Sequence, residues 1–417
     1  MRLGLAGVVV AAAVVAAGGS AGAGVPGSSC PVFPADNVWH ADVSSLPVHP
    51  SGAAWLASMG GPAVRIHPDF GPAGPGEQPY GIPWVTVAGD APKVDVAFEY
   101  ADESDPGPYP LTRATPVEGG SDRHAIMVDR DRCTLYELYG TAWDAEGAVA
   151  GSGAVWDLRS DALRPDGWTS ADAAGLPIFA GLLRRDEVAS GTVDHAIRMT
   201  AQRTDRSYVW PARHQAGAAR DPSLPPMGAR FRLKGAFSLA GFRPDTQAVL
   251  RAMQHYGLIL ADNGSNWYFT GTSEDGWDPA MLDELKTIPA GAFEAVDASS
   301  LMASPDSGRV RAPAPATTLP AATTTTTRPP TTTTRPDTTT TAPATTTSSS
   351  TTVPPPKRVL LLPPTTEAAP DETVSAAPAA ATSGGGPTAW LLALGAAGAA
   401  AGAGWAVLHL RRRRPPP

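Results

Sequence analysis

The sequence predicts one globular domain of the α+β class, rich in β-structure, followed by segments that do not fold with it. Two observations predict the class. Runs of β-branched and aromatic residues outnumber helical patterns, and the helices do not alternate regularly with the strands. No fixed repeat period indicates a propeller or a solenoid. The domain, with mixed or antiparallel sheets and a few helices, is expected over residues 24–302.

A β-hairpin is expected over residues 124–139, around the polar turn 130–132. Side chains alternate across a strand, so His124 starts the apolar face of the first strand. The same His-Ala-Ile sequence returns at 195–197, which places His195 at the start of a second apolar face. A polar ring on an apolar face needs a hydrogen-bonding partner.

The remaining elements are expected from local patterns. The best-defined helix is Pro244 to Tyr256, where an apolar stripe follows Pro244 and Gly257 ends the pattern. Shorter helices are expected within 47–59, 170–188 and 278–286. Further strands are expected at 82–87, 94–98, 152–158, 258–262 and 266–270. Two interpretations of Asn263-Gly264 stay open: a tight hairpin turn, or a loop that presents Asp262 and Asn266 to a ligand.

Both ends of the chain are expected to lie outside the domain. Residues 1–23 are expected to be a signal peptide, because an apolar run ends in a small-x-small cleavage pattern. Residues 303–386 are rich in Thr, Pro and Ala and are expected to form a disordered stalk. The apolar segment 387–410 is long enough for a transmembrane helix, and the basic segment 411–417 marks its cytoplasmic side. The expected location is the cell membrane, with a single span and an extracellular domain.

Charge and cysteine content exclude some classes of protein. The net charge is −8 and the basic residues are scattered, so no nucleic-acid partner is expected. The two cysteines, Cys30 and Cys133, are expected to form one disulfide in an exported protein. The alternative is two free buried thiols.

The histidines carry two alternative interpretations. His124 and His195 are either hydrogen-bonded parts of the core, or they face each other across one cleft as acid–base groups with Glu137 or Asp262 as the carboxylate. His214, on a loop, is a third histidine of this kind. No metal and no cofactor are expected, because the sequence contains no His-x-His, no His-Glu-x-x-His and no cysteine pair at ligand spacing.

Aromatic residues beside amides and carboxylates suggest a ligand-binding surface. Sugar rings stack on aromatic faces while their hydroxyl groups need polar partners. The residues expected to form such a surface are His214, Asn266, Trp267, Tyr268 and Trp210. The alternative for the tryptophans is a place in the core.

The layout of signal peptide, stalk, apolar segment and arginine tail resembles that of secreted, stalked cell-surface proteins of high-GC Gram-positive bacteria. Three short sequence motifs of the domain add to this resemblance: Asp-His-Ala-Ile-Arg at 194–198, Tyr-Val-Trp-Pro-Ala-Arg-His at 208–214, and Leu-Ala-Asp-Asn-Gly-Ser-Asn-Trp-Tyr at 260–268. The resemblance implies an extracellular domain and carries no catalytic assignment.

Two functions from different classes follow. The first is a membrane-anchored, carbohydrate-active hydrolase or lyase that uses histidine and carboxylate acid–base chemistry. The second is a non-catalytic module for polysaccharide binding or adhesion. In both, the expected partner is a polysaccharide or a cell-envelope glycan.

Overall fold

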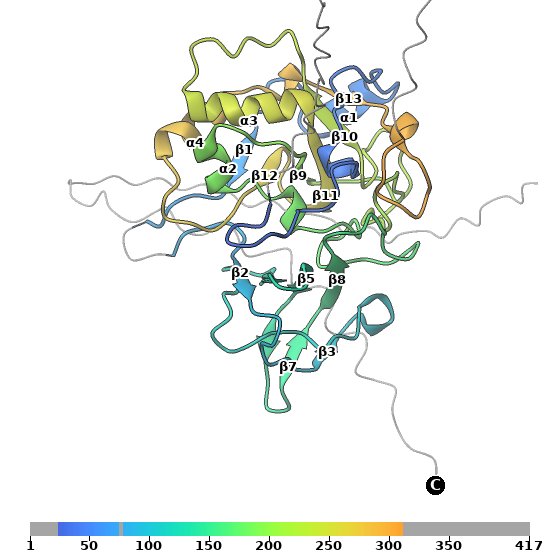
Figure 1. The fold of residues 1–417 in the computed structure, drawn as a ribbon. Coiled ribbons are helices and arrows are strands. Elements are labelled where there is room, and N and C mark those ends of the chain that lie inside the picture. Colours follow the sequence, from blue (N-terminus) through green and yellow to red (C-terminus); the bar gives the residue numbers. More distant parts are fainter. Residues whose placement is uncertain (1–23, 75–77, 312–417) are drawn as a thin grey trace, which may run out of the picture. The chain divides into compact units, whose positions relative to one another are not determined.

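β-Sheets make up most of the fold in the computed structural model, which describes residues 24–74 and 78–311 (Figure 1). Within these residues, sheets of six, four and three strands combine parallel and antiparallel pairing with a few short helices. The β-rich α+β class is therefore confirmed. The segments expected to be a signal peptide, a transmembrane helix and a basic tail, and most of the expected stalk, lie outside the described residues. Of the helices in the described part, none has the length and apolar character to cross a bilayer.

The six-stranded sheet lies in the upper part of Figure 1, together with helices α2, α3 and α4. Its strands, in spatial order, are β1 (His67–Asp69), β12 (Tyr268–Thr270), β9 (Ile197–Ala201), β11 (Leu258–Asn263), β10 (Arg230–Leu233) and β13 (Phe293–Val296). The helices are α1 (Gly52–Ser58), α2 (Arg185–Ser190), α3 (Pro244–His255) and α4 (Pro279–Leu285). Helix α3 packs on β10 through the predicted apolar stripe, which buries Val249, Leu250 and Met253.

The hairpin interpretation of Asn263-Gly264 is wrong. Strand β9 lies between β11 and β12, parallel to the first and antiparallel to the second. The two strands on either side of Asn263-Gly264 therefore never pair with each other. Both of them use the central strand β9, whose residues are distant in the sequence, as their partner.

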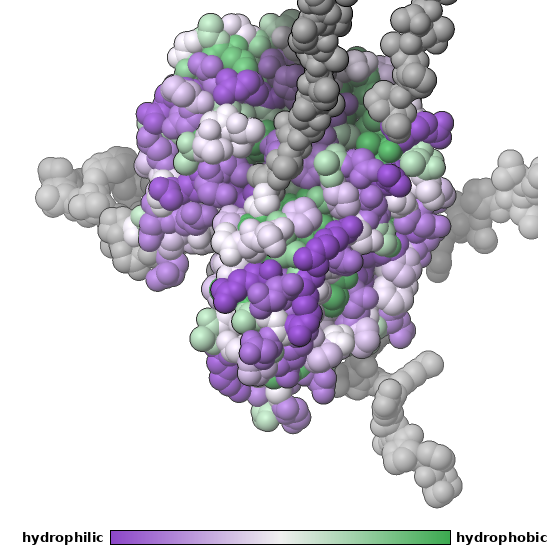
Figure 2. All heavy atoms as spheres, in the orientation of Figure 1, coloured by the Kyte–Doolittle hydropathy of each residue, from purple (hydrophilic) through white to green (hydrophobic). Residues whose placement is uncertain are grey.

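The predicted hairpin at 124–139 is confirmed and belongs to the four-stranded sheet. Its strands, in spatial order, are β2 (Trp84–Val87), β4 (Ala125–Asp129), β5 (Thr134–Tyr139) and β8 (Ser152–Asp157). The three-stranded sheet consists of β3 (Val96–Phe98), β7 (Ala148–Ala150) and β6 (Ala142–Trp143). Single 3₁₀ turns occur at Val38–His40, Ala101–Glu103, Phe179–Gly181, Ala290–Ala292 and Ser299–Leu301. Hydrophilic residues cover most of the face seen in Figure 2.

The helix expected within 170–188 is wrong over most of its length, because α2 begins only at Arg185. Ser170 Oγ donates to the carbonyl of Leu176 at 2.6 Å and accepts from the backbone N–H of Asp172 at 2.9 Å. Such local bonds compete with the helical pattern. They leave a loop that buries the Asp172 carboxylate, which becomes important at the site described below.

The two ends of the described domain are fixed to it and lie side by side. The disulfide between Cys30 and Cys133 is present, with 5.3 Å between the Cα atoms, and joins the N-terminal segment to the hairpin. Near the other end, the Val310 N–H donates to the Asp36 carbonyl at 2.8 Å. The folded contacts thus continue past the expected end of the domain at residue 302.

Candidate functional site

A groove of about 500 Å³ opens beside the C-terminal end of β11. Its wall contains three acidic residues, two tyrosines and one histidine: Glu103, Asp122, Asp262, Tyr100, Tyr139 and His214. We call it the Asp262 groove. It brings together two residues that the sequence singled out, Asp262 and His214.

Among the residues that line this groove, Asp262 has the most strongly shifted pKa. Its side chain is 25% exposed, and Oδ2 lies 3.9 Å from Arg198 Nη2. The guanidinium of Arg198 is already bound to both carboxylate oxygens of Asp172, at 2.8 and 2.7 Å. Burial and the charge of Asp172 therefore raise the pKa of Asp262 to about 7, because they outweigh Arg198. A carboxyl group that holds its proton near neutral pH has the property of a general acid.

His214 presents one ring nitrogen to the groove. Its Nδ1 lies 2.9 Å from the carbonyl oxygen of Ala173. A carbonyl only accepts, so Nδ1 carries a proton and orients the ring. The other nitrogen, Nε2, lies 3.9 Å from Glu103 Oε2, whose carboxylate also accepts the Thr169 N–H at 3.0 Å. The His214 side chain is 28% exposed, so Nε2 is within reach of a ligand.

The tyrosines add aromatic surface to the groove. Tyr100 is 49% exposed. Tyr139 is more buried, and its burial together with the charge of Asp122 raises the pKa of its phenol. The phenol therefore stays protonated and can donate a hydrogen bond to a ligand. Exposed ring faces beside carboxylates match what a sugar needs from a binding site.

His124 lies beneath the Asp262 groove and not in it. The ring is 3% exposed; Nδ1 donates to Glu118 Oε2 at 2.5 Å and Nε2 to the Ala171 carbonyl at 3.2 Å. Both partners only accept, so the buried ring is an imidazolium. Burial alone would lower its pKa, but the hydrogen bond and charge of Glu118 outweigh burial and the pKa is raised. Because Ala171 lines the groove, His124 supports the floor of the site.

His195 lies in a separate buried environment. It contacts Glu187 of α2, and Glu187 also binds Arg184. The expectation that His124 and His195 face each other across one cleft, with Glu137 or Asp262 as the carboxylate, is therefore corrected. Each histidine has its own carboxylate partner from a nearby loop or helix.

Glu137 is fully buried in β5, away from any groove surface. One carboxylate oxygen accepts from the Phe179 N–H at 2.8 Å, and the other accepts from the Ile178 N–H and Trp156 Nε1, both at 3.1 Å. Burial raises the pKa of Glu137 to about 7, against the three hydrogen bonds. This carboxylate joins the sheet to the loop before α2 and cannot meet a ligand in this position.

The two predicted tryptophans also lie outside the groove. Trp267 is 1% exposed and packs between Phe231 and Phe293, with ring centroids 5.3 and 5.4 Å away. Trp210 donates from Nε1 to the Ser307 carbonyl at 2.9 Å. Trp267 is therefore a core residue, the alternative that the sequence left open.

Asn266 and Tyr268 hold the chain on either side of Trp267. Asn266 Oδ1 accepts from the Gln202 N–H at 2.8 Å. Tyr268 stacks on His67 with 4.2 Å between the ring centroids. Neither residue lines the Asp262 groove.

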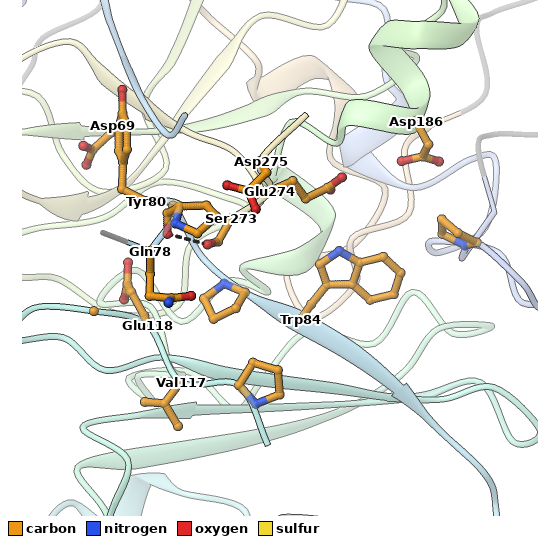
Figure 3. A pocket seen from close by; sticks show the side chains of 16 residues that line it. Asp69, Gln78, Tyr80, Trp84, Val117, Glu118, Asp186, Ser273, Glu274 and Asp275 are labelled. Atoms are coloured by element: carbon orange, nitrogen blue, oxygen red, sulfur yellow. Dashed lines mark hydrogen bonds between the residues drawn. The ribbon is translucent and has the colours of Figure 1, made fainter. Parts of the chain in front are cut away.

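A second hollow, of about 980 Å³, was not predicted from the sequence (Figure 3). Asp69, Glu118, Asp186, Glu274 and Asp275 line it, together with the rings of Tyr80 and Trp84. Burial raises the pKa of Asp69. The two hollows are neighbours along the chain, because Glu118 lines this one and Asp122 lines the Asp262 groove.

Over residues 24–74 and 78–311, no group of three or more His, Cys, Asp or Glu side chains is arranged to hold a metal ion. No family model, no curated protein and no solved structure matches the chain. The function is therefore argued from the Asp262 groove itself.

Proposed function

We propose that the domain cleaves glycosidic bonds of a polysaccharide, with Asp262 as the proton donor. The single observation that carries the proposal is the carboxyl group of Asp262, which has a pKa of about 7 and is exposed to a groove lined by two further acidic residues and two tyrosines. Breaking a glycosidic C–O bond leaves negative charge on the departing oxygen. A positioned acid that still holds its proton near neutral pH removes this charge.

In the hydrolytic form of the reaction, Asp262 gives its proton to the departing oxygen as the C–O bond breaks. Water then adds to the anomeric carbon and loses a proton to Glu103 or Asp122. A lyase would break the C–O bond on the other side of the bridging oxygen. His214 Nε2 would take a proton from the sugar carbon next to a carboxylate, the electron pair would form a C=C bond as the C–O bond on the neighbouring carbon breaks, and Asp262 would protonate the departing oxygen. Hydrolysis produces new reducing ends alone, whereas elimination also produces unsaturated ends.

A non-catalytic binding module is the second candidate function. The exposed ring of Tyr100 favours it, because stacking on a sugar needs no acid–base group. The two candidates differ in their products and not in their ability to retain a polysaccharide.

The test uses the full-length protein with a panel of neutral and acidic polysaccharides, assayed for retention and for new reducing or unsaturated ends. Asp262→Asn should reduce turnover by about 10²–10⁴-fold, the usual contribution of a positioned proton donor, and should leave retention unchanged. Asp283→Asn, which changes a 75% exposed aspartate on α4, is the matched control. Retention without products from the unmodified protein would leave only the binding module. Products that survive Asp262→Asn would remove Asp262 from the mechanism.

The proposal includes an extracellular place for this domain, anchored to the cell membrane through residues 387–410. The Cys30–Cys133 disulfide supports it, because structural disulfides persist in oxidising compartments. Mild proteolysis of intact cells should release a soluble fragment that ends between residues 312 and 386. Release only after lysis would contradict the extracellular location.

A further inference from the structure

The long loop between β9 and β10, residues 202–229, carries three exposed arginines beside the Asp262 groove: Arg203 and Arg206 in its first part and Arg220 in its second. They line two concave surfaces of about 880 and 450 Å³, which share Arg220. The smaller surface also contains Asn263, and Asn263 lines the Asp262 groove as well. The arginines therefore lie on a surface that continues from the proposed active site.

These arginines differ from the other arginines around the site. Arg164, Arg198 and Arg213 are each buried and bound to a carboxylate. By contrast, the guanidinium groups of Arg203, Arg206 and Arg220 make no hydrogen bond or ion pair with any described residue. Three positive groups thus lie without a carboxylate partner on a chain whose net charge is −8.

The acidic side chains nearby offset part of this charge but use their oxygens elsewhere. Asp205 is 8% exposed, and its carboxylate accepts from the Asp221 N–H and from Ser207 Oγ. Asp221 lies close enough to Arg203 for an electrostatic interaction, but its Oδ1 accepts from the N–H and hydroxyl of Ser223. Asp166, which is 70% exposed, accepts from the hydroxyl of Tyr208 on the larger surface and lies 3.7 Å from Arg213 Nη2. None of these acids forms an ion pair with the three arginines, so their guanidinium groups are available to an anionic ligand.

The two parts of this loop are joined, which holds the backbone that carries the arginines in place. The Arg206 N–H donates to the Ala219 carbonyl at 3.1 Å, and the Asp205 carboxylate accepts the Asp221 N–H. Ordering such loops costs conformational entropy, and here the fold has already ordered them before any ligand binds.

We propose that Arg203, Arg206 and Arg220 bind the carboxylate or phosphate groups of an anionic glycan, whose uncharged part occupies the Asp262 groove. The planar fork of a guanidinium matches the two oxygens of either group. Glu103 and Asp122 repel anions from the groove itself, so charge on the glycan is best placed over the arginines. This inference rests on the hydrolytic form of the proposed function and specifies its substrate class.

The test compares binding of the full-length protein to a polyuronate, a poly(glycerol phosphate) and a neutral polysaccharide at several salt concentrations. Variants are Arg203→Gln, Arg206→Gln and Arg220→Gln, singly and together. Each single change should weaken binding of the anionic polymer about two- to fivefold, the worth of an exposed charge pair. The triple variant should weaken it on the order of tenfold or more, with a smaller salt dependence. Binding of the neutral polysaccharide should not change.

Arg251→Gln, an exposed arginine on α3, is the matched control. Unchanged affinity of the triple variant for both anionic polymers would overturn the inference, as would no binding of either polymer by the unmodified protein or an equal loss in the control. Comparison of the two polymers identifies carboxylate or phosphate as the bound group. The proposed function fails separately: anion binding that needs the arginines, with turnover that ignores Asp262→Asn, would keep the anion site and remove the catalytic role.

Discussion

Glu187 and His195 form an ion pair in the interior, with 3.1 Å between Oε2 and Nε2 and both side chains almost completely buried. The other ring nitrogen donates to the Ala196 carbonyl at 2.8 Å. Both partners only accept, so the ring carries two protons. The pair joins helix α2 to the start of β9. Strand β9 pairs with β11, the strand that carries Asp262.

The charge of His195 should make the fold sensitive to alkaline pH. Burial alone lowers its pKa, but Glu187 outweighs burial, so the pKa is raised from 6.5 on folding. The stability gained is complete below pH 6.5 and is lost as the pH rises through the raised value. The melting temperature of His195→Gln should therefore change less with pH than that of the unmodified protein over this range. His255→Gln, at a 54% exposed position, is the control. Equal pH slopes for His195→Gln and the unmodified protein would contradict the charge assignment.

Glu137→Gln should lower stability without a separate effect on polysaccharide chemistry. An amide places an NH₂ group where one carboxylate oxygen now accepts from the Phe179 N–H or from the Ile178 N–H and Trp156. An unpaired buried donor costs about 1–3 kcal/mol. Thermal and denaturant unfolding measure the change, with exposed Glu146→Gln as control. A stable variant with reduced turnover per folded molecule would instead give Glu137 a direct role in the reaction.

Removal of the disulfide should destabilise the domain strongly. The bridge spans 103 residues, and closing a loop of that size contributes on the order of 4 kcal/mol in the chain-entropy model. The double variant Cys30→Ser/Cys133→Ser avoids a free thiol and should show this loss in denaturant unfolding. Mass spectrometry of the unreduced, exported protein should find the two peptides linked. Two thiols that react with an alkylating agent would contradict the bridge.

Turnover of a polysaccharide should fall as the pH rises above about 7. Asp262 must hold its proton to act as an acid, and its pKa lies at about 7. The catalytically active fraction therefore decreases tenfold per pH unit well above this value. The pH–rate profile of kcat/KM measures it, and Asp262→Asn should lose this alkaline limb. An unchanged alkaline limb in the variant would assign the decline to another group.

Local patterns predicted the parts of the fold that depend on neighbours in the sequence. The hairpin β4–β5 and helix α3 follow from alternation and from an apolar stripe that ends at Gly257. Strand β10 has no such signal, because its sequence Arg-Phe-Arg-Leu indicates a segment whose arginine side chains are exposed. In the structure Arg230 and Arg232 are buried, since backbone carbonyls and Glu294 accept their hydrogen bonds. No sequence period predicts partners that come from distant loops.

The site was predictable only in part for the same reason. Asp262 and His214 were singled out by residue type, and they lie in one groove. The partners of His124 and Asp172 were not predictable: Glu118 comes from an irregular loop, and Arg198 comes from a strand where an exposed side chain would be expected. The sequence analysis paired the histidines with Glu137 or Asp262, whereas their carboxylate partners in the fold, Glu118 and Glu187, precede them by only six and eight residues.

The pairing of residues 36–38 with 308–310 also decides how the domain would respond to mechanical load. A pull applied at Arg311 acts first on the contacts of the final strip, such as those from Val310 N–H to Asp36 and from Val38 N–H to Gly308. Once these bonds open, the load passes back along the chain toward β13, an edge strand of the six-stranded sheet. The segment that they release at the N-terminal side stays attached through Cys30 to Cys133. The N-terminal end of the domain is thus held by a covalent bond, whereas its C-terminal end is held only by hydrogen bonds and side-chain contacts.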